Sequence, residues 1–213
     1  SGPAIEKVVY WLEKAVTVAE NESQRKALTA LIEYYRTGDL KKFDQYSVLW
    51  VEDSTSMVDL INGFIETYGD AMDYRATYES LVYFKDLEAT RRMEAIAAQA
   101  QWFEDNAPIM DGHKKKKVTG VTGRVITVAG EAGDVSPSTP IGINLPNSNW
   151  VRAKHGSKSV TIGNIVNSYN EVNKTSGVLE EFNLKPERIE AQRQWGDLAD
   201  NLHTDLHEVI GHA

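Results

Sequence analysis

Near its last residue the chain carries two histidines and a glutamate, His207, Glu208 and His212, in the run His-Glu-Val-Ile-Gly-His. Neutral imidazole binds Zn²⁺ at roughly 2.0–2.1 Å, and a catalytic zinc site keeps one position open for water. A neighbouring carboxylate can accept a proton from that water and so make it a nucleophile. These residue types predict a zinc-dependent hydrolytic site, with His207 and His212 as ligands and Glu208 as general base.

The spacing of the histidines places a condition on their helix. In the common zinc hydrolase helix they are four residues apart, whereas His207 and His212 are five apart. On a regular helix, position i+5 lies about 140° around the axis from i, and i+4 only about 40°. Both rings can reach one metal if the helix absorbs an extra residue, as in a π-bulge, and Gly211 tolerates that distortion best. His203, four residues before His207, offers an alternative pair that needs no bulge.

The composition is that of an ordinary globular protein and narrows the functional classes. Of 213 residues, 41% are hydrophobic and 25% are charged, which is enough apolar material for a sizeable core. The sequence has no cysteine, so any metal must be bound by His, Asp or Glu. The formal charge of −8 argues against a general nucleic-acid binder, and the one basic run, Lys114–Lys117, is typical of a solvated loop. No run approaches the roughly 18 apolar residues of a membrane span.

Hydrophobic periodicity predicts an α+β chain that is mainly helical. Helical spacing of apolar residues predicts helices at 5–19, 27–37 (ended by Gly38), 40–50, 87–106, 163–174 and 187–212. Aromatic and β-branched runs predict strands at 64–68, 78–84 and 124–129. The segments 107–121 and 130–149 are predicted to be irregular, because Gly, Pro, Ser and Asn are frequent there. The last helix is expected to bury the side that holds Trp195, Leu198, Leu202, Leu206, Val209 and Ile210.

Four further segments accompany the terminal motif. They are Gly63–Tyr68 (G-F-I-E-T-Y), Arg75–Glu79 (R-A-T-Y-E), Pro140–Asn147 (P-I-G-I-N-L-P-N) and Val160–Asn164 (V-T-I-G-N). Together with H-E-V-I-G-H, they resemble segments of peptidase family M49, the dipeptidyl peptidase III family, and they occur in the family's order. The resemblance covers most of residues 5–213, although the segment Gly130–Thr139 is longer here than in the family pattern.

The resemblance implies a zinc exopeptidase that releases dipeptides from the N-terminus of short peptides. In the family, residues at the positions of Glu66, Asn144 and Asn147 hold the substrate, and a carboxylate suits its free ammonium group while amides suit its peptide units. The family's third zinc ligand is a glutamate from a later segment. The chain is therefore expected to be an internal part of a longer enzyme and to be inactive by itself.

Two other positions acquire roles by the same resemblance. Tyr68 matches a tyrosine that helps to stabilise the oxyanion, a task that suits a phenol because it can donate a hydrogen bond to negative oxygen. Glu79 is implied to contribute to the ammonium subsite, and pairing with Arg75 is the alternative for its carboxylate.

The family's two-lobe plan assigns residues 1–86 and 125–171 to part of a β-containing lobe, and 87–124 and 172–213 to part of a helical zinc-binding lobe. The resemblance also implies a cytoplasmic location and peptide substrates. Two other functional classes remain as alternatives: a catalytically inactive peptide-binding module of the same fold, and a structural helical domain whose terminal motif is accidental.

Overall fold

The computed structural model describes residues 2–118, 121–136 and 138–212, and within it the chain forms two compact units. The first unit runs to Met57 and includes Leu145–Lys158, and the second comprises Val58–Asn144 and the residues from Ser159 onward. Thr119 and Gly120 of the predicted loop 107–121, and Pro137 of the predicted irregular segment 130–149, lie outside the described residues. The predicted division into a β-containing and a helical lobe stays a prediction.

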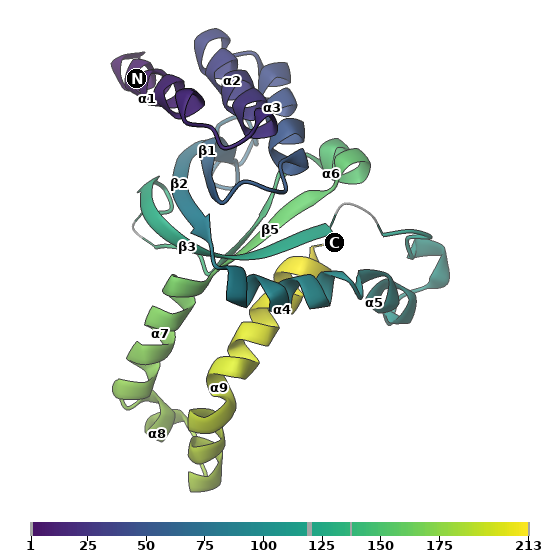
Figure 1. Ribbon diagram of the computed structural model, residues 1–213. Helices are drawn as coiled ribbons and strands as arrows, with labels where there is room; N and C mark the ends of the chain where they lie inside the picture. The colour runs from purple at the N-terminus through teal and green to yellow at the C-terminus, as the bar shows by residue number, and fades with distance from the viewer. Residues whose placement is uncertain (1, 119–120, 137, 213) are drawn as a thin grey trace. The chain divides into compact units, whose positions relative to one another are not determined.

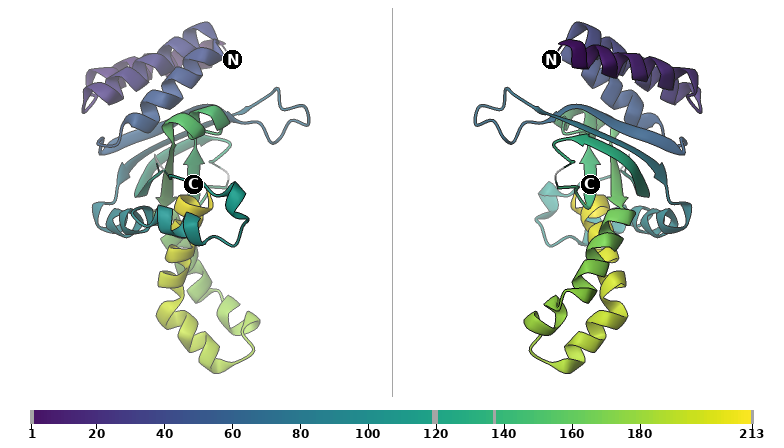
Figure 2. Two further views of the ribbon diagram at one scale, coloured as in Figure 1. Left: turned by 90° about the vertical axis from the view of Figure 1, so that its right-hand side faces the viewer. Right: turned by 90° about the vertical axis from the view of Figure 1, so that its left-hand side faces the viewer.

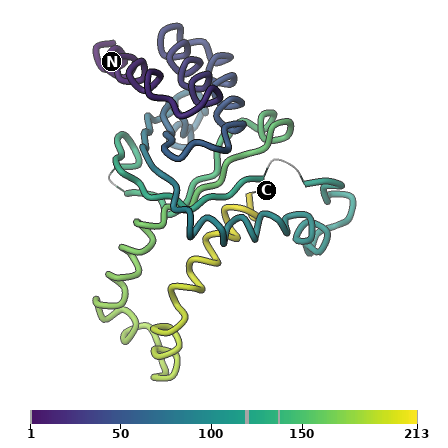
Figure 3. The backbone as a smooth tube through the Cα atoms, in the orientation of Figure 1, coloured from purple at the N-terminus to yellow at the C-terminus, as the bar shows by residue number. Residues whose placement is uncertain are grey.

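Four helices make up most of the first unit: α1 (Gly2–Thr17), α2 (Glu22–Thr37), α3 (Leu40–Glu52) and α6 (Asn149–His155) (Figure 3). The side chain of Asn21 accepts a hydrogen bond from the N–H of Gln24 and so begins α2. Gly38 ends that helix with a φ of 69°, as its position in the sequence predicts. Helix α6 was not expected, because its seven residues follow a run rich in proline and asparagine.

A five-stranded sheet supplies the frame of the second unit, with the strand order β1-β2-β3-β5-β4 (Figure 1). Its strands are β1 (Val58–Glu66), β2 (Thr77–Lys85), β3 (Val121–Gly133), β4 (Gly142–Leu145) and β5 (Ser157–Ile162). β1 and β2 are antiparallel, and Gly63 lies opposite Glu79. The segment predicted to be irregular therefore contains the end of β3 and the whole of β4.

The predicted strand 64–68 is wrong at both ends, since β1 begins at Val58 and ends at Glu66. The chain turns directly afterwards, because the N–H of Asp70 donates to the carbonyl oxygen of Thr67 at 2.9 Å. Tyr68 is thus on a turn and not on a strand.

The remaining elements of the second unit are helical. They are α4 (Leu87–Ala97), α5 (Ala100–Asn106), the short turn η1 (Asp111–His113), α7 (Gly163–Thr175), α8 (Val178–Phe182), α9 (Pro186–Leu206) and η2, a π-helical turn at His207–Gly211. The single helix predicted at 87–106 is interrupted between α4 and α5. Helices α7 and α9 run beside each other and are connected through α8 (Figures 1 and 2).

The expected buried side of α9 is only partly correct. Trp195, Leu198 and Leu202 are 57%, 48% and 36% exposed, whereas Val209 in the following turn is fully buried. The cause is that α7 and α8 meet another side of the helix, where Gln192, Gly196 and Asp200 line a cavity with residues of α7 and α8. The apolar stripe is therefore packed only at its C-terminal end.

The α+β fold class is confirmed: helices predominate and one sheet of long and short strands accompanies them. Within the described ranges, every helix is too short or too polar to cross a membrane.

Candidate metal centre and substrate subsites

The two histidines of the terminal motif are brought together by the predicted distortion of the helix. Residues His207–Gly211 form a π-helical turn at the end of α9, which confirms the condition set by the five-residue spacing. Nε2 of His207 and Nε2 of His212 lie 3.2 Å apart. Two nitrogens bound tetrahedrally to one Zn²⁺ at roughly 2.0–2.1 Å would be about 3.3 Å apart. The pair therefore fits a single zinc ion.

Glu208 completes this cluster, and one ligand atom from each of the three residues lies within 4.8 Å of the others. His203 lies outside the cluster, and its side chain is exposed on α9. The carboxyl group of Glu208 is buried, and its Oε2 has no hydrogen-bond partner among the described residues. Burial raises the pKa of Glu208 to about 7. A buried carboxyl oxygen with no partner is suited to accept a proton from a substrate or water in the site.

The space for this carboxyl group comes from Gly142 at the start of β4. A Cβ atom at Gly142 would lie 2.2 Å from Oε1 of Glu208, so any other residue there would displace the carboxyl group. The glycine of the G-I-N segment thus has a packing role, which its place in the sequence did not reveal.

Apolar packing holds the π-helical turn against the sheet. Val209 forms a fully buried cluster with Met93 of α4 and Val125 of β3. The backbone of β3 approaches closely at Gly123, where a Cβ atom would lie 2.7 Å from Cγ2 of Val209. These contacts fix the residue that directly follows the metal-site glutamate.

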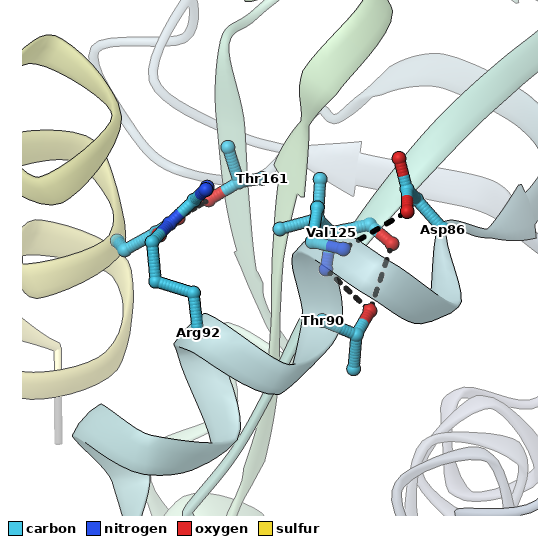
Figure 4. A network of polar contacts seen from close by, with 7 residues as sticks. Asp86, Thr90, Arg92, Val125 and Thr161 are labelled. Carbon is cyan, nitrogen blue, oxygen red and sulfur yellow. Dashed lines mark hydrogen bonds and ion pairs between the residues drawn. The ribbon is translucent and has the colours of Figure 1, made fainter. Parts of the chain in front are cut away.

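Polar contacts hold the preceding turn. Asp205 is fully buried and accepts hydrogen bonds from Nε of Arg92 at 2.5 Å and from Oγ1 of Thr161 at 3.0 Å. Figure 4 shows Arg92 reaching from α4 toward Thr161 of β5. In the same view, Thr90 of α4 is joined to the backbone of Val125 by two hydrogen bonds of 3.1 Å. The end of α9 is thereby attached to both α4 and β5.

A second group of carboxylates lies at the paired ends of β1, β2 and β3. Glu79 is buried, and Gly133, the neighbour of Asp134, lies opposite it on β3. Burial, and then the negative charges of Glu66 and Asp134, raise the pKa of Glu79 to about 7. Arg75 is exposed, and the described residues include no ion pair between it and Glu79. The group can attract an ammonium ion, since a positive charge would relieve the repulsion.

We expect the pKa of Glu79 to fall in an Asp134→Asn variant, because one of the two negative neighbours is removed. The unfolded chain releases this proton near pH 4.5 and the folded chain near pH 7, so this group makes the free energy of unfolding decrease as the pH rises between those values. Carboxyl ¹³C chemical shifts measured against pH give the pKa, and Asp200→Asn on α9 is the control. An unchanged pKa in Asp134→Asn would contradict the charge coupling.

The other predicted substrate residues are placed separately. Asn144 lies on β4, and its Nδ2 donates to Oγ of Ser159 at 2.6 Å. Tyr68 is 82% exposed on the turn after β1, so its phenol points into solvent. Asn147 belongs to the first unit and is exposed.

Sequence reasoning missed several residues around the site, namely Arg92, Asp134, Gly142, Ser159, Thr161 and Asp205. One signal was available: Ser159 and Thr161 alternate with Val160 and Ile162, which is the pattern of a strand with one polar face. The others depend on contacts between distant segments.

The longest described helix of this α+β fold ends in a histidine pair and a buried glutamate, residue types that can hold a metal ion. The chain belongs to peptidase family M49, whose sequence profile matches residues 2–213. It is 28% identical over 211 residues to dipeptidyl peptidase 3 of Rattus norvegicus, and the match covers 99% of this chain and 28% of the relative.

Two solved structures share the fold. Dipeptidyl peptidase III of Corallococcus sp. strain EGB has a TM-score of 0.79 at 22% identity, covering 96% of this chain and 37% of that one. The enzyme of Caldithrix abyssi has a TM-score of 0.74 at 24% identity, covering 87% and 35%. The chain spans about 28% of the length of the curated relative from rat.

Proposed function

We propose that the full-length protein is a zinc-dependent exopeptidase that releases dipeptides from the N-terminus of short peptides. The observation that carries the proposal is the cluster of His207, Glu208 and His212, with 3.2 Å between the two Nε2 atoms. Membership of family M49 and the similarity to enzymes named dipeptidyl peptidase 3 support the choice of reaction. The cytoplasm, implied by the same resemblance, is the proposed location.

In this proposal His207 and His212 hold the zinc ion, together with a third ligand, the glutamate of a later segment that the family resemblance implies. The 213 residues alone are then expected to be inactive. Bound zinc would supply a Lewis acid that polarises the peptide carbonyl group. Glu208 accepts the proton of the attacking water and later returns it to the leaving amine, and its buried, unpartnered Oε2 suits that exchange.

The substrate's free ammonium group is held by Glu66 and Glu79 in this proposal. β4 lies at one edge of the described sheet, and an edge strand can pair with an extended peptide. Asn144 on that strand, together with Asn147, would bind the first peptide units. Tyr68 would donate to the oxyanion, and its exposed phenol is available for that contact.

Dipeptidyl arylamides test the proposed reaction. We expect the full-length protein to cleave the substrate with a free N-terminus, and N-acetylation to lower kcat/KM by about 10–100-fold, because a charge-assisted contact contributes about 1.5–3 kcal/mol. A Glu66→Gln variant should show a smaller difference between the two substrates. Equal cleavage of both substrates by the unaltered protein would rule out an exopeptidase. Binding of peptides without cleavage would favour the inactive peptide-binding module.

A further inference from the structure

The hydroxyl group of Ser159, on β5, lies between a predicted substrate residue and the metal-site turn. Ser159 is almost fully buried, and its Oγ donates to the backbone carbonyl oxygen of Glu208 at 2.6 Å. The same Oγ accepts a hydrogen bond from Nδ2 of Asn144 at 2.6 Å. One hydroxyl group therefore connects β4, β5 and the π-helical turn.

The carbonyl group of Glu208 loses its regular helical donor because the helix is distorted there. In a regular α-helix the N–H of His212 would donate to the carbonyl oxygen four residues earlier, which is that of Glu208. In this turn it donates to Ile210 instead. A buried carbonyl group without a donor is costly. The Ser159 hydroxyl group donates to this carbonyl oxygen in place of the N–H group that the distortion has redirected.

A second contact from the same strand face fixes the turn before the histidines. Side chains two residues apart on a strand point to one face, and Thr161 donates to Asp205 at 3.0 Å. The two hydroxyl groups of β5 thus hold the chain on either side of His207, which is the stretch whose geometry brings His212 back to the first histidine.

We propose that Ser159 is a positioning residue of the metal centre. Its hydroxyl group holds the π-helical turn in the form that brings His207 and His212 to one ion, and it links that form to Asn144. This inference rests on the proposed function, because it assigns a role within the same site.

The test uses the full-length protein with Ser159→Ala and, as matched control, Ser168→Ala. Ser168 also donates to a backbone carbonyl group, that of Asn164, but on the exposed surface of α7. We expect Ser159→Ala to raise the dissociation constant for Zn²⁺ by about 10–100-fold, the usual effect of removing a residue that supports a metal site from outside its ligands, and to lower kcat more than it changes KM. In the cobalt-substituted protein its visible spectrum should shift, since the ligand geometry changes. Ser168→Ala should match the unaltered protein in all three measurements.

A shape-matched pair separates positioning from folding. Ser159→Thr keeps the hydroxyl group and Ser159→Val lacks it, so the spectrum and zinc affinity should be close to those of the unaltered protein only in the threonine variant. Equal metal affinity and spectra in the two variants would overturn the proposal. So would a pair in which the valine variant fails to fold in the metal-free state while the threonine variant folds, because Ser159 would then be a folding residue.

These readouts are independent of peptidase activity. If the unaltered protein binds zinc but releases no dipeptides, the proposed function is wrong. The zinc affinities of the Ser159 variants then still test the positioning role of Ser159. If the unaltered protein binds no zinc, both proposals are wrong.

Discussion

Replacing Glu208 with glutamine should reduce kcat of the full-length enzyme by about 10²–10⁴-fold, the usual contribution of a general base. Glutamine has nearly the same shape, so it fits the space beside Gly142 that the carboxyl group now occupies. It cannot accept the proton, so catalysis should be lost without a loss of metal. Steady-state kinetics and metal analysis of the same preparation measure the two effects.

The outcome for Glu208 distinguishes two roles. Glu190→Gln, on the exposed surface of α9, is the matched control and should leave kcat and zinc content unchanged. Loss of zinc from Glu208→Gln would make this residue a ligand. An undiminished kcat with zinc bound would exclude it as the base.

Replacing His212 with alanine should remove stoichiometric zinc from the full-length protein, whereas His203→Ala should retain it. Nε2 of His212 lies 3.2 Å from that of His207, a separation suited to one ion, and losing one of three protein ligands leaves fewer than a catalytic zinc site normally has. Zinc content after dialysis against a weak chelator measures the effect.

The alternative ligand pair gives the opposite pattern. If zinc persists in His212→Ala and is lost from His203→Ala, the pair one turn apart, His203 and His207, binds the metal. His113→Ala, in the exposed turn η1, controls for the loss of a surface imidazole.

The convergence of His207 and His212 could be predicted from the sequence because it follows from helical arithmetic. Histidines five residues apart converge only on a helix with an extra residue per turn, and the structure has a π-helical turn at His207–Gly211. The same arithmetic located an apolar stripe on α9 but not the neighbour that covers it. Trp195 is exposed because α7 and α8 contact a different side of the helix.

Short elements and non-local contacts were beyond prediction. β4 has four residues and α6 has seven, too few for a hydrophobic period to emerge. Tyr68 was misplaced because its aromatic ring suggested a strand that ends two residues earlier, at Glu66. The contacts of Arg92 and Ser159 with the end of α9 and its π-helical turn span 113 and 49 residues of sequence, and no local pattern reports them.

Side chains with hydroxyl groups alternate with apolar ones along β5, so the geometry of the candidate metal site depends on the register of this strand. Ser159 and Thr161 face the metal-site turn, and the side chains between and beside them, Val160 and Ile162, are apolar. A slip of β5 by a single residue would turn every side chain to the opposite face. It would present Val160 and Ile162 to the carbonyl group of Glu208 and the carboxylate of Asp205, where neither could donate. An insertion or deletion within this strand should therefore disable the centre even though none of the three cluster residues has changed.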